Sequence, residues 1–138
     1  IEQEALEIAK ITSEDLHSYM EMPEAYKMLT KMLAKYVDKY DKKDKFHLVG
    51  YNNASFDNQF FRAWFTQSND NYFGSWFWAD SIDLMVLASH TLMNERPTME
   101  NFQLKTVAKK LGIVVDEEKL HDAKYDIDLC IEMYKQLK

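Results

Sequence analysis

The stretch His121-Asp122-Ala123-Lys124-Tyr125-Asp126 begins the last predicted helix, and it carries an acid where an apolar residue is expected. At about 100° per residue, residues 122–137 form one apolar face from Ala123, Ile127, Cys130, Met133, Tyr134 and Leu137. Asp126 falls inside this face, between the directions of Met133 and Leu137. A buried carboxylate without a partner is strongly unfavourable or loses its charge. The sequence therefore predicts that a cation, a metal ion or a set of hydrogen-bond donors compensates Asp126.

The composition indicates a folded domain without a broad affinity for polyanions. The chain has 138 residues, 46% of them hydrophobic, which is enough for one core. Its formal net charge is −6, so a role with nucleic acid requires a local site. Cys130 is the single cysteine, which excludes an internal disulfide and fits a reducing, cytoplasmic setting. No apolar run approaches the roughly 20 residues of a membrane span, so we expect no membrane contact.

Helix signals dominate the first forty residues. Residues 1–12 are expected to be an extended or irregular lead-in, and Thr12 is expected to cap a short helix that ends near Met20. Pro23 suits the first position of the next helix. The apolar side of that helix is predicted to consist of Ala25, Met28, Leu29, Met32, Leu33 and Tyr36, with Lys27, Lys31, Lys35 and Lys39 facing elsewhere. A lysine row offers contacts to phosphate, but such rows are more often simply solvated.

Two short strands are predicted between helices. Residues 46–51 favour a buried strand, and the aromatic-rich run 72–78, which we expect mainly to pack in the core, leads to a second strand at Ser81-Ile82. Ser55 is expected to cap a helix that runs to about Phe65. Asp57 lies at the centre of its predicted inner face, which is formed by Phe60, Phe61 and Trp64.

The remaining segments are helical. Asp83 is expected to cap one helix, and Gly112 to close another that contains Leu104, Val107, Ala108 and Leu111. The order of elements predicts one α/β domain over residues 1–138. Only two or three short strands are visible, which is too few for a stable sheet unless others come from elsewhere in the natural chain or from a partner.

Asp57 and Asp126 are thus predicted on inward faces near the starts of two helices, and His121 closely precedes Asp126. Hard cations such as Mg²⁺ prefer carboxylate oxygens, water and phosphates, and a pair of them promotes phosphodiester cleavage. A histidine with an ordinary pKa near ~6.5 can accept a proton from water at neutral pH. The three residues therefore predict a metal site with His121 as general base.

Two motifs in the chain resemble those of the DEDDh family of 3′-5′ exonucleases, which includes proofreading epsilon-type subunits. Asn53-Ala54-Ser55-Phe56-Asp57 is similar to the second motif of the family, and His121-x-Ala123-x-x-Asp126 resembles its third motif. Residues 11–16, 81–84 and 104–113 follow the family's order of elements. The resemblance covers nearly the whole chain.

This resemblance implies an RNase H-like fold and stepwise release of nucleotides from a single-stranded 3′ end, in proofreading, repair or turnover. It also implies two divalent cations, Mg²⁺ or Mn²⁺, with Asp57 and Asp126 as ligands and His121 as the catalytic base. Phe56 and Asn53 are expected to bind substrate, Phe56 by stacking on the terminal base. A DNA polymerase is a further implied partner.

The chain departs from the family pattern at two points. Asn52 stands where the second motif usually has a histidine, and residues 1–12 contain no Asp-x-Glu of the first motif. Asp116-Glu117-Glu118 is a superficial copy, which we interpret as an exposed acidic loop. We expect residues upstream of Ile1 to supply the first motif and the missing N-terminal strands. These residues alone would then be an incomplete fold with half a metal site, no turnover and a sheet edge prone to association. The alternative is a non-catalytic nucleic-acid-binding or polymerase-tethering module of the same fold.

Overall fold

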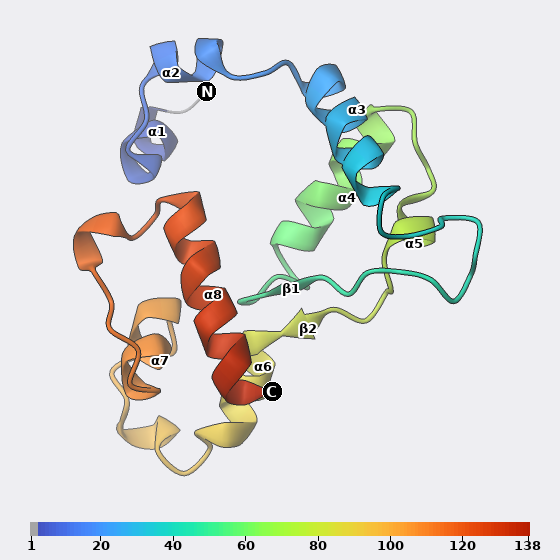
Figure 1. The fold of residues 1–138 in the computed structure, drawn as a ribbon. Helices are drawn as coiled ribbons and strands as arrows, with labels where there is room; N and C mark the ends of the chain where they lie inside the picture. Colours follow the sequence, from blue (N-terminus) through green and yellow to red (C-terminus); the bar gives the residue numbers. More distant parts are fainter. Residues whose placement is uncertain (1–2) are drawn as a thin grey trace. The chain divides into compact units, whose positions relative to one another are not determined.

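The computed structural model describes residues 3–138, which divide into two compact units (Figure 1). Unit 1 contains the chain up to Ser18 together with Asp83–Lys138, and unit 2 is the continuous segment Tyr19–Ile82. The single domain expected over residues 1–138 stays a prediction.

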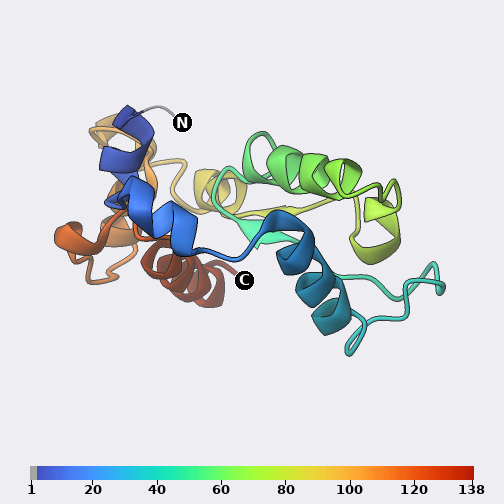
Figure 2. The ribbon, with the colours of Figure 1, turned by 90° about the horizontal axis from the view of Figure 1, so that it is seen from above.

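Unit 2 contains helices α3 (Met22–Leu33), α4 (Asp57–Gln67) and α5 (Phe73–Trp76) and strand β1 (Val49–Gly50). It ends within strand β2 (Ile82–Asp83), which pairs with β1 in a two-stranded sheet, and the two strands lie side by side in Figure 2. The N–H of Ile82 donates to the carbonyl of Leu48 at 2.8 Å. A parallel bridge between Phe46 and Phe77 adds one more pairing. The described residues thus contain both predicted strands and no wider sheet.

The predicted buried strand at residues 46–51 is only partly correct. Strand geometry is confined to Val49–Gly50, and burial alternates along the segment. Phe46, Leu48 and Gly50 are partly buried, whereas His47 and Val49 are exposed. This period of two is expected when only one face of a strand packs on a core. The strand therefore has one covered face instead of two.

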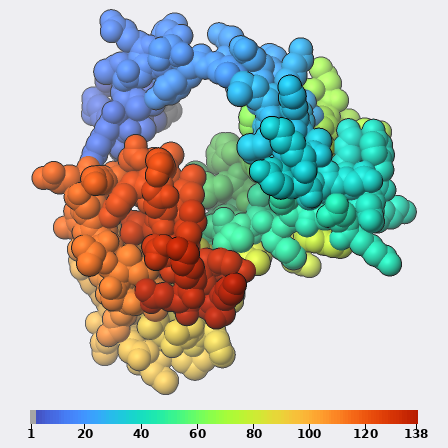
Figure 3. Space-filling view, viewed as in Figure 1, coloured from blue at the N-terminus to red at the C-terminus, as the bar shows by residue number. Residues whose placement is uncertain are grey.

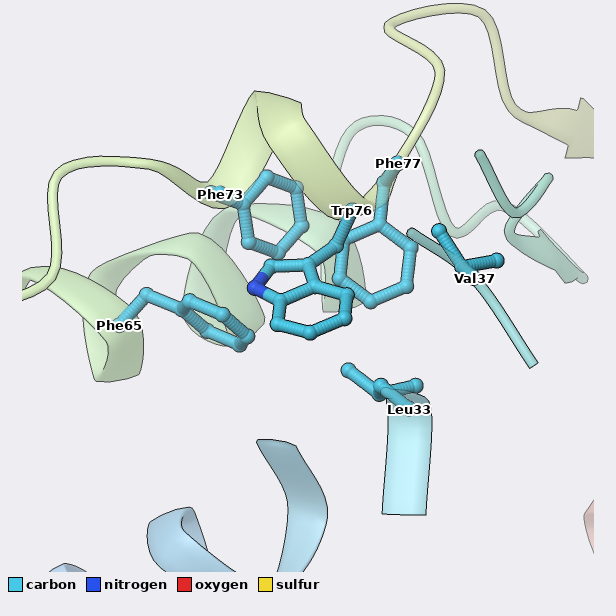
Figure 4. Close-up of a cluster of buried hydrophobic side chains, with 6 residues drawn as sticks. All are labelled: Leu33, Val37, Phe65, Phe73, Trp76 and Phe77. Atoms are coloured by element: carbon cyan, nitrogen blue, oxygen red, sulfur yellow. The ribbon is translucent and has the colours of Figure 1, made fainter. Parts of the chain in front are cut away.

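The core of unit 2 is an aromatic cluster (Figure 4). Its buried members are Leu33, Val37, Phe65, Phe73, Trp76 and Phe77. Phe65 packs edge-on against Phe73 and Phe61, with ring centroids 5.1 and 5.4 Å apart. Edge-to-face pairs add stabilisation beyond the burial of apolar area. The packing role predicted for the aromatic run 72–78 is confirmed for Phe73, Trp76 and Phe77.

The apolar face of α3 is rotated from the predicted one. The helix begins at Met22, so Pro23 lies in its first turn, one residue after the predicted start. The side facing the core consists of Tyr26, Leu29 and Leu33, followed by Val37, whereas Met28, Met32 and Tyr36 are exposed. Both sets repeat at helical spacing, so periodicity does not choose between them. The observed face is the one that brings the Tyr26 ring against Phe65, with ring centroids 5.2 Å apart.

The hydroxyl of Tyr26 gives unit 2 an expected pH dependence. Burial, and then the hydrogen bond that this hydroxyl donates to the Asp70 carboxylate, raise the pKa of Tyr26 to about 12. Because the folded pKa lies above the unfolded value near ~10, this contribution to stability is complete below about pH 10. It is lost as pH rises toward about 12, since the unfolded chain releases the proton first. The free energy of unfolding should therefore fall across this window.

Urea unfolding at a series of alkaline pH values measures this effect. Trp64, Trp76 and Trp78, the three tryptophans of the chain, all lie in unit 2, so tryptophan fluorescence reports on it. Tyr26→Phe should flatten the decline, whereas Tyr40→Phe, which changes an exposed tyrosine, should keep it. An equal decline in both variants would contradict the assignment to Tyr26.

Unit 1 is helical. Its elements are α1 (Gln3–Ala9), α2 (Ser13–Ser18), α6 (Leu84–Thr91), η1 (Arg96–Thr98), α7 (Leu104–Lys110), η2 (Glu117–Lys119) and α8 (Ala123–Leu137). Helices α6 and α8 pack together. The buried side chains come mainly from α6, α7 and α8 and include Leu84, Ala88, Val107, Ala108, Leu129 and Met133. No helix within residues 3–138 combines the length and apolar character that crossing a membrane requires.

Helix α1 corrects the irregular lead-in that was expected for residues 1–12. Gln3–Ala9 is helical because this segment is rich in residues of high helix propensity, and it buries Leu6. Lys10, with a φ of 56°, follows the helix in the left-handed region. The part of the expectation that concerns Ile1 and Glu2 lies outside the described residues.

Helix ends were better predicted than the lead-in. The Thr12 hydroxyl accepts from the Asp15 N–H at 3.0 Å, and the Asp15 carboxylate accepts from the Thr12 N–H at 2.7 Å. This reciprocal pair caps α2, and its hydrogen bonds, the one from the Thr12 backbone first, lower the pKa of Asp15. Asp83 caps α6 by accepting from the Met85 N–H at 2.9 Å, as predicted. Gly112, with a φ of 80°, lies just beyond α7, also as predicted.

Candidate metal and nucleic-acid site

Asp126 lies in the first turn of α8, and one of its carboxylate oxygens is buried without a partner. The helix is capped by Asp122, whose side chain accepts from the Tyr125 N–H at 2.9 Å. The Oδ1 atom of Asp126 is buried and has no hydrogen bond within the described part of the chain. An unpaired buried acceptor costs roughly 1–3 kcal/mol. Hydrogen-bond donors therefore do not compensate this oxygen, which leaves it available to a cation.

The buried face of α8 differs from the predicted face but still includes Asp126. Leu129 and Met133 are buried, whereas Ala123 and Ile127 are exposed. Asp126, Leu129 and Met133 follow the i, i+3, i+7 spacing of one helical face. The predicted face was rotated, but the prediction that Asp126 points inward is confirmed by its buried oxygen.

His121 is exposed and lies two residues before α8. Its backbone has a φ of 70°, in the left-handed region that few residues other than glycine adopt. The neighbouring chain holds this conformation, because the Asp122 N–H donates to the Lys119 carbonyl at 3.1 Å and the Asp116 N–H donates to the Tyr125 hydroxyl at 2.6 Å. Strain of this kind is common at functional sites and here fixes the direction in which the imidazole leaves the backbone.

Asp57 is the first residue of α4 and is exposed. The inner face predicted for this helix is partly wrong, because Phe65 is buried, Phe61 and Trp64 are partly buried and Phe60 is exposed. The predicted cap is also wrong. The Ser55 hydroxyl donates to the Asn52 side chain at 2.7 Å, and the N-cap residue is Phe56. An exposed carboxylate in the first turn suits the helix dipole and remains accessible to a cation.

Asn53 builds the turn between β1 and α4. It is buried, and its carbonyl accepts from the Phe56 and Asn58 N–H groups at 3.3 and 2.9 Å. A Cβ atom added to Gly50 would lie 2.8 Å from the Asn53 Cβ, so this approach requires glycine. The turn fixes where α4 begins and hence where Phe56 and Asp57 lie. Direct contact between Asn53 and substrate stays a prediction.

Phe56 is exposed next to Asp57 and pairs with a second exposed ring. Its ring centroid lies 5.1 Å from that of Phe60, in an edge-on arrangement. Exposed aromatic rings are suited to stack on nucleic-acid bases. Phe60 was predicted on the inner face of α4, so this exposed pair was not predicted, although the spacing of four residues between Phe56 and Phe60 was the available signal.

The acidic loop at residues 116–118 is exposed, as predicted. Glu117 forms ion pairs with Lys109 at 3.3 Å and Lys105 at 3.6 Å. The hydrogen bond and charge of Lys109, followed by the charge of Lys105, lower the pKa of Glu117. Asp116 accepts from the Glu118 N–H at 3.1 Å. These local partners agree with a surface role for the loop.

The candidate residues are divided between the two units. His121 and Asp126 belong to unit 1, whereas Asn53, Phe56 and Asp57 belong to unit 2. Within residues 3–138, no three His, Cys, Asp or Glu side chains are grouped as they would be around a metal ion. The carboxylates of Asp57 and Asp126 are nevertheless of the kind that Mg²⁺ and Mn²⁺ prefer. The unpartnered Oδ1 atom of Asp126 fits such an ion. The binding of two divalent cations stays a prediction.

A family comparison covers nearly the whole chain. The model of the RNase H superfamily matches residues 6–136, and the chain therefore belongs to this superfamily. Neither the search of curated proteins nor that of solved structures found a significant match. RNase H-like proteins generally hydrolyse nucleic acids, typically with divalent metals, so membership indicates a nuclease-type function and nucleic-acid binding. The superfamily expected from the sequence is thereby confirmed.

Proposed function

We propose that the chain is part of the catalytic domain of a metal-dependent 3′-5′ exonuclease of the DEDDh kind, and that it lacks the first motif and the N-terminal strands. The observation that carries this proposal is the buried, unpartnered Oδ1 of Asp126, at the start of a helix that His121 shortly precedes. In a member of the RNase H superfamily, a carboxylate that is buried without a hydrogen-bond partner supports the assignment of Asp126 as a ligand of a catalytic cation. The spacing of both residues agrees with the third motif of the DEDDh family.

Each residue has a distinct role in this proposal. Asp126 and Asp57 hold two divalent ions, Mg²⁺ or Mn²⁺, which when bound supply Lewis-acid chemistry to phosphodiester hydrolysis. His121 accepts the proton of the attacking water, and its exposed position leaves the imidazole accessible to substrate. Phe56 stacks on the terminal base, with Phe60 beside it. The water oxygen forms a bond to phosphorus and the bond between phosphorus and the 3′ oxygen breaks. The 3′ oxygen of the shortened strand takes up a proton, and a nucleoside 5′-monophosphate leaves.

The second candidate is a non-catalytic module that binds nucleic acid or tethers a polymerase. It is favoured by one observation, that residues 1–12 contain no Asp-x-Glu of the first motif. The test below therefore uses the protein encoded by the complete gene. Binding of nucleic acid without turnover by that protein would support the module.

Digestion of single-stranded DNA and RNA labelled at the 3′ end tests the proposal. With Mg²⁺ or Mn²⁺, Asp126→Ala and Asp57→Ala should each lower the rate by at least about 10²-fold, and His121→Ala by about 10²–10⁴-fold. Asp128→Ala is the matched control, because Asp128 is an exposed acid of α8 that pairs with Lys124 at 2.7 Å. It should keep full activity. Equal digestion by all four variants would refute the assignment.

A further inference from the structure

A basic segment of unit 2 takes no part in the proposed catalytic site. Residues 27–45 contain seven lysines and three aspartates, a net charge of +4 in a chain of −6. They cover the second half of α3 and the loop after it, coloured light blue to cyan in Figure 3. Because an acidic protein repels polyanions over most of its surface, a segment of this charge is a candidate local site.

The acids of this segment hold the loop and do not pair with its lysines. Asp38 accepts from the Tyr40 N–H at 3.0 Å, and Asp41 accepts from the Lys43 N–H at 2.8 Å. Asp44 accepts from the Asp38 N–H at 2.9 Å. Among residues 3–138, ion pairs involve only lysines of unit 1, namely Lys105, Lys109, Lys119, Lys124 and Lys135. The ammonium group of Lys45 donates to the Gly74 carbonyl at 2.6 Å, whereas those of Lys27, Lys31 and Lys39 form no ion pair within the described residues and are left for a ligand.

A pocket of about 540 Å³ opens in this segment, and its lining includes Lys27, Lys31, Lys39, Tyr40 and Trp76. The Lys39 Nζ atom lies 5.3 Å from the ring centroid of Tyr40 and 5.6 Å from that of Trp76. Tyr40 is 85% exposed, whereas Trp76 is 3% exposed and belongs to the core cluster of Figure 4. The pocket thus combines a fixed aromatic floor, an accessible ring, three amines and one carboxylate, that of Asp38, which accepts from the Tyr40 N–H.

This combination suits one chemical class of ligand. Lysine amines neutralise phosphates, and an accessible tyrosine ring offers a face on which any base can stack. A volume of this size is typical of sites for small organic groups, so a base and its sugar fit where a free phosphate would leave most of the space unused. We propose that this pocket binds a nucleotide unit of single-stranded nucleic acid, with its phosphates on Lys27, Lys31 and Lys39 and its base on Tyr40. The choice of ligand rests on the proposed nuclease function.

Fluorescence anisotropy of a labelled oligothymidylate, with EDTA present to prevent cleavage, tests this proposal in the protein encoded by the complete gene. The triple variant K27Q/K31Q/K39Q should bind about tenfold more weakly or worse near ~0.1 M salt. The slope of log K against log salt should fall by roughly 2, since each single-strand phosphate contact contributes about 0.7. Tyr40→Ala should weaken binding by about fivefold or more, and Tyr40→Phe should preserve it.

The control is K105Q/K109Q/K135Q, which removes the same formal charge from lysines that already pair with Glu117 and Glu132. It should bind nearly as well as wild type. Equal weakening of both triple variants, or absence of binding by the wild-type protein, would overturn the proposal. Inorganic pyrophosphate is the competitor. If it displaces the strand at matched phosphate concentration and Tyr40→Ala has no effect, the pocket is a general anion site and the proposal fails.

The outcome is separable from that of the exonuclease test. Selective loss of binding in K27Q/K31Q/K39Q, without turnover by any protein, would retain the pocket and remove the exonuclease. Turnover that depends on Asp126, with unchanged binding by the triple variant, would do the reverse. Lys27, Lys31, Lys39 and Tyr40 are all exposed, so urea unfolding should be the same for these variants and wild type.

Discussion

Asp126→Asn is expected to abolish hydrolysis at nucleic-acid 3′ ends without destabilising the ion-free fold. The Oδ1 atom of Asp126 is buried and unpartnered within the described residues, an arrangement that opposes folding by roughly 1–3 kcal/mol. A neutral amide of the same shape removes the charge from this position, so the free energy of unfolding should stay the same or rise by up to about 2 kcal/mol. The amide is also a weaker ligand for Mg²⁺ than a carboxylate. Function would thus be gained at the expense of stability.

Thermal unfolding with and without Mg²⁺ or Mn²⁺ separates these two effects. Wild type should gain about 1.4 kcal/mol when the ion is at tenfold its dissociation constant, and Asp126→Asn should gain much less. Asp128→Asn, which disrupts only the exposed pair with Lys124, should lose at most about 0.5 kcal/mol and keep the response to the ion. A loss of more than about 1 kcal/mol by Asp126→Asn in ion-free buffer would mean that the native carboxylate has a stabilising partner.

Local signals in the sequence predicted those helix ends that depend on residues close together in the chain. Thr12 and Asp83 cap helices as predicted, because each bonds to a backbone N–H two or three residues further on. Gly112 has the left-handed conformation for which glycine is suited. Ser55 shows the limit of such signals, since its hydroxyl bonds to Asn52 in the turn that Asn53 holds. That turn depends on the approach of Asn53 to Gly50, which no propensity contains.

Helix faces were predicted less well, for a physical reason. Hydrophobic periodicity predicts the direction of the apolar face around the helix axis, and on α3 two overlapping sets of apolar residues fit the helical spacing about equally. The core selected the set with Tyr26 and Leu33 through contacts to α4 and α5, which are distant in sequence. The same ambiguity explains why Phe60 and Ile127 were predicted to point inward, whereas both are exposed. Asp126 was predicted to point inward, and it still does, because the observed face of α8 with Leu129 and Met133 includes its direction.

The candidate site shows the same division. Motif spacing predicted His121, Asp126, Asp57 and Phe56 as site residues, whereas only the structure shows the left-handed backbone of His121. The lysine row on α3 was predicted to be simply solvated. Its pocket depends on the loop after α3, which Asp38 and Asp44 fold back, and on Trp76 from a distant part of the sequence. Such long-range contacts are beyond a reading of neighbouring residues.

Phe65→Ala is expected to destabilise unit 2 by about 3–5 kcal/mol, most or all of the stability of a unit of this size. Phe65 is 0% exposed. Its ring meets four others, those of Tyr26, Phe61, Phe73 and Phe77, with centroids between 5.1 and 6.2 Å away. Truncation removes these contacts and leaves a cavity, because the rings come from different elements and cannot all collapse into the space. Urea unfolding followed by tryptophan fluorescence measures the loss.

Phe60→Ala is the matched control, since it removes the same side chain from the same helix at a position that is 67% exposed. The free energy of unfolding should change by no more than about 0.5 kcal/mol. Phe60 pairs with Phe56, so this variant should instead weaken the binding of single-stranded substrate. Comparable destabilisation by the two truncations would contradict the assignment of the core. A loss of stability in Phe65→Ala and of substrate binding in Phe60→Ala would mean that α4 packs with one face and presents the other to nucleic acid.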